Sequence, residues 1–216
     1  MTTRLRILAS AAILTLMAAT AAAQPITIVS QTGPDSTVYL IGPDEGSRDS
    51  ATQILTASWT SANEYTDVSI SARLYCNCGH FAATAFLTTN IGPDVPPVGA
   101  AVYLVAAAAF NAPLPPQQSD WVTLFTGLDL PPGTYYLTVA APRRTVGGWT
   151  SGSPLTTVTD AGVSANSHYR AYGNAVNLTY DPVSQFEILN FNGQYLVTGN
   201  PIGDPFAEPA GVYDGY

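Results

Sequence analysis

The chain has 216 residues, of which 46% are hydrophobic and only 10% are charged, and its formal net charge is −8. Fifteen acidic residues stand against seven arginines and no lysine, so the surface repels the phosphates of nucleic acids and of anionic membranes. The hydrophobic content excludes a disordered chain, because a chain of this length and composition can bury a genuine core.

Residues 1–23 have the layout of a secretory signal peptide. Two arginines begin the segment, an apolar run covers residues 7–19, and three alanines precede Gln24. The apolar run is shorter than the roughly 20 residues that span a membrane, although a retained N-terminal anchor is the alternative. Cleavage leaves 193 residues with five arginines and fifteen acids, a formal charge of −10. We therefore expect a secreted or cell-surface protein with no membrane span in the mature chain.

Residues 24–199 are expected to form one all-β domain. The cleanest alternation lies in residues 67–75. Val68, Ile70, Ala72 and Leu74 are expected to face inward, and Ser69, Ser71 and Arg73 outward. A Pro-Pro-Gly turn at residues 131–133 starts another alternating strand. Strands are expected at 26–29, 37–41, 53–60, 67–75, 83–89, 102–109, 121–125, 134–139, 169–172, 176–180, 186–191 and 195–198. With no convincing helix, this pattern predicts a two-sheet antiparallel β-sandwich with jelly-roll-like connections.

Three segments depart from that pattern. The run 102–109 contains four consecutive alanines and would also suit a helix, but its neighbours favour a strand. Residues 142–167 are rich in Gly, Ser and Thr and are expected to be a long loop. Residues 200–216 are rich in Pro, Gly and Asp, and we expect a flexible tail there because they cannot bury enough apolar surface.

Three short motifs, in this order, resemble exported bacterial proteins that carry a PEP-CTERM sorting signal. They are the run 84–93 (TAFLTTNIGP), the pair 125–128 (FTGL) and 132–137 (PGTYYL), and Gly147-Gly148-Trp149. The resemblance implies a β-sandwich associated with the cell surface or with exopolysaccharide, and it brings no catalytic residue. Residues 206–210 keep a Glu-Pro pair, but no apolar helix or Arg cluster follows. Either the anchor is lost, in which case we expect a released product, or the sequence is truncated.

Cys76 and Cys78 are the only cysteines, and in an oxidising compartment two cysteines usually pair. Their i, i+2 spacing overlaps the Cα separation that disulfides accept, so we expect a bridge. Free thiols are the first alternative. A metal site with His80 is the second, and it would need a fourth ligand such as His168 or an Asp. We predict neither a metal nor a cofactor.

No arrangement of residues indicates catalysis. The closest approach to a Gly-x-Ser-x-Gly motif, residues 162–166, lacks the final glycine and the expected strand–turn–helix context. Glu187 is a lone acid in a strand pattern, whereas a glycosidase needs two facing carboxylates. The acidic cluster in residues 44–49 lacks the ordered spacing of a calcium loop and is interpreted as a solvated turn.

Trp149 is the candidate ligand-binding residue, because an exposed tryptophan on a loop could stack on a sugar ring together with Tyr169 and Tyr172. The alternative is that Trp149 folds back and covers an open end of the core. The sequence thus leaves two hypotheses. The first is an exported non-enzymatic β-sandwich of the cell surface or extracellular matrix, with an extracellular polysaccharide as partner. The second is a glycan-binding module that uses Trp149 and nearby tyrosines.

Overall fold

We analysed the protein in a computed structural model. The structure describes residues 24–43, 52–77, 79–91, 103–141, 147–174, 179–180, 187–189 and 191–202. The expected signal peptide, the acidic cluster in residues 44–49, Cys78 and all but the first three residues of the expected tail lie outside this part.

Within the described residues all regular secondary structure is β-strand, and every pairing is antiparallel. None of these residues forms a helix long and apolar enough to cross a membrane. The strands are β1 (Ile26–Thr32), β2 (Asp35–Pro43), β3 (Thr52–Ser61), β4 (Tyr65–Cys76), β5 (His80–Thr88), β6 (Leu104–Pro113), β7 (Gln118–Leu130), β8 (Gly133–Ala140), β9 (Gly147–Gly152), β10 (Thr156–Thr159), β11 (Val163–Asn174), β12 (Thr179–Tyr180), β13 (Glu187–Leu189) and β14 (Tyr195–Pro201).

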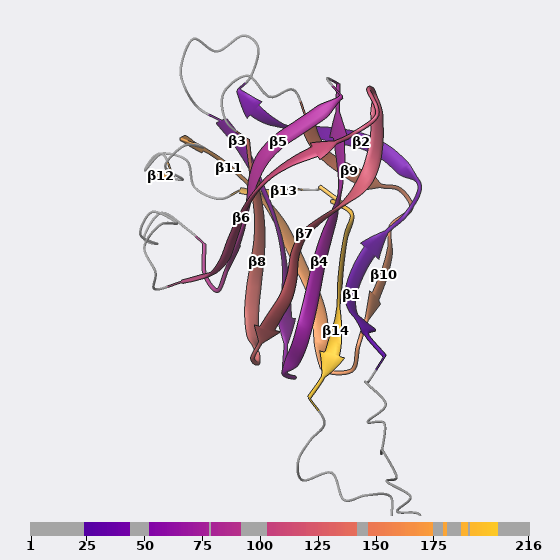
Figure 1. The fold of residues 1–216 in the computed structure, drawn as a ribbon, viewed down its shortest axis with the longest axis vertical. Helices are drawn as coiled ribbons and strands as arrows, with labels where there is room; N and C mark the ends of the chain where they lie inside the picture. Colours follow the sequence, from indigo (N-terminus) through magenta and orange to yellow (C-terminus); the bar gives the residue numbers. More distant parts are fainter. Residues whose placement is uncertain are drawn as a thin grey trace, which may run out of the picture.

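The strands fall into two groups, and the longest of them run along the long axis of the molecule (Figure 1). In the first group, the β4 sheet, the order is β10-β1-β14-β4-β7, and β9 with β2 extends it alongside the end of β4. In the second, the β3 sheet, the order is β6-β5-β8-β3-β11, with β12 and β13 paired to β11. β2 joins the two groups, because its last residues pair with the start of β3.

The all-β antiparallel architecture expected from the sequence is therefore confirmed, and the two groups are consistent with a β-sandwich. From β3 to β8 the chain crosses between the groups at every connection except the β5–β6 hairpin. This order is compatible with jelly-roll connections, which stay a prediction.

The core lies between the inward faces of the two groups. From the β4 sheet it takes Val68, Ile70 and Leu74, all 0% exposed, while Ser69, Ser71 and Arg73 alternate outward as the sequence predicted. From the β3 sheet it takes side chains of alternating residues on β3, β5 and β8, among them Leu55, Ala57, Trp59, Ala85, Leu87, Tyr135, Leu137 and Val139. The period-2 pattern of these strands is thus the pattern of burial.

The expected long loop at residues 142–167 is wrong for much of its length. Residues 147–152 form β9, residues 156–159 form β10, and β11 begins at Val163. β9 pairs with β2 on one side and with the end of β4 on the other, and all six of its residues are buried. A strand paired on both sides and packed on both faces gains from small residues, so its Gly-Gly-Trp-Thr-Ser-Gly sequence shows little alternation.

Two connections between the groups lie against each other at one end of the molecule. The amide of Gln117 donates to the carbonyl of Cys76, 2.9 Å away, and the amide of Leu114 donates to the carbonyl of Gly79 at 3.1 Å. These bonds hold the β6–β7 connection beside the β4–β5 corner. They place the start of β7 next to the end of β4, where β9 and β2 also pass.

Candidate functional site

Trp149 does not point into solvent, so its expected role in stacking on a sugar is wrong. Its side chain is 0% exposed, because β9 directs it into the core. The indole Nε1 donates a hydrogen bond to the carbonyl oxygen of Gln194 at 2.8 Å, and the ring meets Phe191 edge-on at 5.7 Å between centroids. The structure thus supports the alternative reading, in which this tryptophan fills the core.

Tyr169, one of the two candidate tyrosines, does not share a site with the buried Trp149. Tyr169 is half-buried on β11, with its ring 6.2 Å from that of Tyr136 on the outer face of the β3 sheet. Tyr172, also on β11, pairs through its backbone with Gln53 of β3, and its side chain lies outside the described part. A single aromatic platform built from the three residues is therefore not present.

Of the two cysteines, Cys76 belongs to the residues that the structure describes. Cys76 is buried at the end of β4, and its Sγ lies 3.1 Å from the carbonyl oxygen of His80. Because Cys78 lies outside the described residues, the expected bridge stays a prediction. Among the described residues no group of three or more His, Cys, Asp or Glu side chains comes together to hold a metal.

His168, considered from the sequence as a fourth metal ligand, is a buried core residue. Its ring packs edge-on against Phe191 at 5.3 Å and against Tyr195 at 6.2 Å. Burial lowers its pKa from 6.5 to about 4, although a hydrogen bond with the Gly193 backbone acts in the opposite direction. The hydroxyl of Ser164 is exposed and donates to Asn166 Oδ1 at 3.3 Å. The buried His168 is therefore not a base for this exposed serine.

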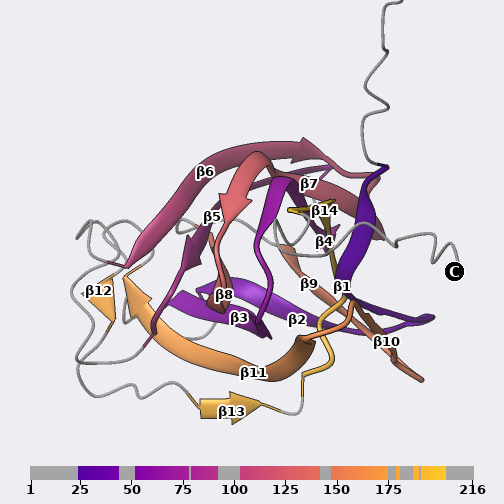
Figure 2. The same ribbon diagram turned by 90° about the horizontal axis from the view of Figure 1, so that it is seen from below.

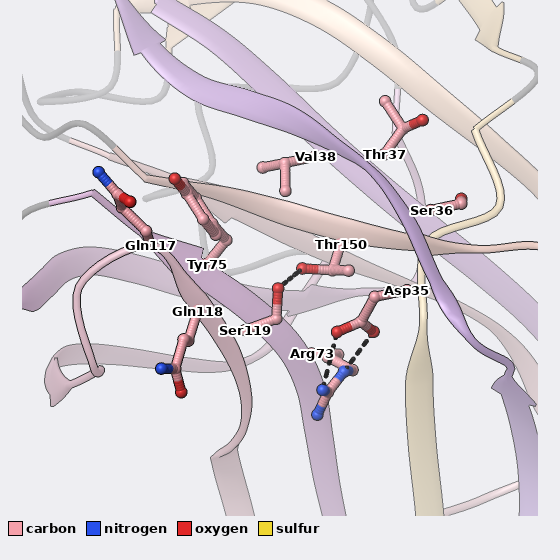
Figure 3. A pocket seen from close by; sticks show the side chains of 10 residues that line it. All are labelled: Asp35, Ser36, Thr37, Val38, Arg73, Tyr75, Gln117, Gln118, Ser119 and Thr150. Carbon is pink, nitrogen blue, oxygen red and sulfur yellow. Dashed lines mark hydrogen bonds and ion pairs between the residues drawn. The ribbon is translucent and has the colours of Figure 1, made fainter.

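A groove that the sequence did not predict lies on the outer face of the β4 sheet (Figure 3). It has a volume of about 410 Å³, within the range of small-ligand sites. The lining side chains come from β2, β4, β7 and β9 and from the connection before β7, and most are polar. They are Asp35, Ser36, Thr37, Val38, Arg73, Tyr75, Gln117, Gln118, Ser119 and Thr150.

Gly148 lies beside the groove, where β9 packs closely against β2. It lies on β9 between Tyr75 of β4 and Leu40 of β2 in the strand register. A Cβ on Gly148 would stand 2.6 Å from Val38 Cγ1, and a Cβ on Gly147 would overlap the ring of Phe81. The glycine pair that suggested a flexible loop therefore allows neighbouring strands and the ring of Phe81 to approach closely.

One wall of the groove is held by an ion pair. Arg73 donates from Nε and from a terminal nitrogen to the two carboxylate oxygens of Asp35, at 2.6 and 2.8 Å. The buried side chain of Gln194 adds a hydrogen bond from its Nε2 to Asp35 Oδ1 at 3.0 Å. The Arg73 guanidinium holds the pKa of the Asp35 carboxyl below its ordinary 3.8, and the carboxylate raises the pKa of Arg73. At neutral pH this wall is polar and carries no net charge.

The opposite wall carries hydrogen-bonding groups that the fold leaves free. Within the described part of the chain, the side chains of Tyr75, Gln117 and Gln118 make no hydrogen bond. Figure 3 shows the three on the side of the groove away from the ion pair, with a bond of 2.7 Å between Ser119 and Thr150 in the middle. Gln117 has a φ of 60°, a left-handed conformation that costs energy in a non-glycine residue. Two amides and a phenol are thus available to a ligand.

Trp121 stands beside the groove and is 38% exposed. It is paired with Arg73 across β7 and β4, and the guanidinium carbon lies 6.0 Å from the centre of the indole ring. This is the limit of a cation–π contact. The sequence did predict Arg73 as outward-facing, but only the strand register shows that it meets Trp121 and Asp35.

Comparison with known proteins gave no relationship: no protein-family model, no curated protein and no solved structure matches the chain.

Proposed function

We propose that this protein is an exported, non-enzymatic β-sandwich that binds an extracellular polysaccharide through the groove lined by Tyr75, Gln117 and Gln118. The observation that carries the proposal is the set of free amide and phenol groups beside an exposed tryptophan. Sugars offer many hydroxyls, which both accept and donate hydrogen bonds, and apolar ring faces that pack on indoles. The groove presents both kinds of partner within one face of the sheet.

The electrostatics of the groove favour binding over catalysis. Glycoside hydrolysis uses a pair of carboxyl groups, one of which must act as an acid with a raised pKa. Among the described residues, Asp35 is the one carboxylate that lines the groove, and Arg73 holds it with its pKa lowered. It is therefore a fixed anion that positions Arg73, and the proposal assigns it no proton transfer.

The export part of the proposal is supported by the signal-peptide pattern of residues 1–23 and by the resemblance to PEP-CTERM proteins. An acidic, lysine-free mature chain agrees with a partner other than nucleic acid. Intact mass of the exported protein tests this part: a mature chain that begins at Gln24 supports it, and a retained Met1 contradicts it.

Binding is tested by probing the purified protein against immobilised polysaccharides that include neutral glucans, mannans and galactans as well as polymers of uronic acids. Replacing Gln117 and Gln118 together by Ala should reduce the signal about tenfold or more, because two amides that line the groove are removed. Tyr75→Phe should weaken binding, and Tyr136→Phe on the other sheet is the matched control that should bind normally. If the wild-type protein binds no polysaccharide, or if the double variant binds as well as the wild type, the proposal is wrong.

A further inference from the structure

A second hollow, also of about 410 Å³, lies between β6 and β7. These are the edge strands of the two groups, and they lie next to each other without a backbone ladder between them (Figure 2). Its lining combines apolar side chains with three polar ones. The main contributors are Phe110, Leu114, Trp121, Asn111, Asp120 and Thr123.

The hollow is poorly suited to an added β-strand. A strand would need free backbone groups along the edge of β7, but the amide of Trp121 already donates to Asp120 Oδ1 at 2.8 Å. Further along β7 the pairing register with β4 shifts, and Gly127 has a left-handed φ of 68°. Such irregularities are common ways of protecting an edge strand. The occupant must therefore be recognised by side chains.

The two hollows lie on consecutive parts of β7. Gln118 and Ser119 line the first groove, and residues 120–123 line the second hollow. Trp121 lines the second and is paired with Arg73, which lines the first. Gln118 and Val122 are four positions apart, about 13 Å of extended strand, which is longer than one sugar ring. A ligand that fills both hollows is therefore a chain that passes Trp121.

Charge limits the chemistry of that chain. The first groove contains the neutralised pair of Arg73 and Asp35. Among the described residues that line the second hollow, one is charged: Asp120, whose carboxylate is exposed. A polymer of uronic acids or sulfated sugars would place its own anions near Asp120. An uncharged polymer meets no such repulsion, and its hydroxyls can bond to Asn111 and Asp120.

We propose that the hollow between β6 and β7 is a second subsite for the same ligand, and that this ligand is an uncharged polysaccharide bound over several sugar units. The inference rests on the proposed function, because the first subsite is the groove argued above. Filling the second subsite adds contacts without a second loss of translational freedom, so affinity rises with chain length.

The test is a length series. Oligosaccharides from the disaccharide to the octasaccharide, prepared from the neutral polymer that gives the strongest signal in the array, are titrated by calorimetry. For the wild type the Kd should tighten about tenfold or more between short and long chains. Asn111→Ala should remove most of this gain while leaving the Kd of the disaccharide near the wild-type value. Asp120→Asn keeps an acceptor for the Trp121 amide and should raise binding of uronic acid oligomers several-fold. Circular dichroism and thermal melting confirm that both variants are folded.

The outcomes separate the two proposals. Binding that does not depend on length, or an Asn111→Ala variant that keeps the full length dependence, rules out the second subsite but leaves the groove in place. Tighter binding of uronic acid chains than of neutral ones contradicts the assignment of ligand class. If no oligosaccharide binds at any length, the proposed function and the second subsite both fail.

Discussion

Arg73 on β4 and Asp35 at the start of β2 form a bidentate ion pair, with two N–H···O distances of 2.6 and 2.8 Å. The two residues are 38 positions apart in the chain, and neither their spacing nor their surroundings in the sequence predicted that they meet. Gln194, from the segment before β14, donates to the same carboxylate and accepts from the amide of Gly33 at 2.9 Å. The pair thus ties three separate segments of the chain to one side of the groove.

Asp35→Asn should lower the free energy of unfolding by about 1 kcal/mol or less, since both side chains are partly exposed and solvent screens the pair. Because Arg73 lowers the pKa of Asp35, the pair stabilises the protein above the ordinary pKa of 3.8 and loses its effect as the pH falls through the folded-state pKa. Urea unfolding should therefore show a constant difference between variant and wild type from neutral pH down to about pH 5. A difference that grows on acidification would contradict this assignment.

Trp149→Ala should destabilise the protein by about 3–5 kcal/mol, the usual cost of emptying a buried aromatic site. Trp149→Phe should cost less, because Phe refills most of the volume and the Gln194 carbonyl still accepts from the amide of Arg73 at 3.0 Å. Both effects are measured by denaturant midpoint.

The folded Trp149→Phe variant also distinguishes the two tryptophans as ligand contacts. It should bind polysaccharide as the wild type does, because Trp149 is 0% exposed. Trp121→Ala should lose about tenfold in affinity, equivalent to about 1.4 kcal/mol. The reverse ranking would restore Trp149 as the binding residue and remove Trp121 from the site.

His168 should make the protein acid-sensitive. Its pKa is lowered to about 4 in the folded state, so between pH 6.5 and 4 the unfolded chain binds a proton that the folded one does not. The contribution of the neutral His168 to stability is complete above pH 6.5 and is lost as the pH is lowered towards 4. The total loss is about 3 kcal/mol, because each pKa unit corresponds to 1.36 kcal/mol. Urea midpoints at pH 7.5 and 5 should differ less in His168→Phe than in the wild type. If the midpoint changes by the same amount between these two pH values in both proteins, His168 binds its proton as readily in the folded protein as in the unfolded chain, and the assignment is wrong.

Gly148→Ala should be strongly destabilising, by about 2 kcal/mol or more, because its Cβ would stand 2.5 Å from the carbonyl oxygen of Tyr39 and push β9 away from β2. Gly133→Ala is the matched control. Its Cβ would meet no heavy atom closer than 3.8 Å, so thermal melting should show almost no change. A Gly148→Ala protein as stable as the wild type would show that the two strands are not packed this closely.

The sequence alone determined the class of the fold and the faces of its best strands. In β4, alternation from Val68 to Leu74 placed the apolar side chains inward and Arg73 outward, because a strand in a sandwich has one dry and one wet face. Local alternation failed at β9, where pairing on both sides and burial of all six residues remove the contrast between faces. The sequence pattern consequently predicts a loop at Trp149, whereas the residue belongs to a core strand.

Only the tertiary structure decided where ligand-binding groups gather. Asp35, Arg73, Gln118 and Thr150 lie on four different strands, and their proximity depends on the register of β2, β9, β4 and β7. Shifting any one of these strands by a single residue would turn its side chain to the other face. That register is set by packing between residues distant in the chain, such as Gly148 against Val38 and Trp149 against Gln194. Propensity and spacing describe a chain only locally, and so could not place the groove.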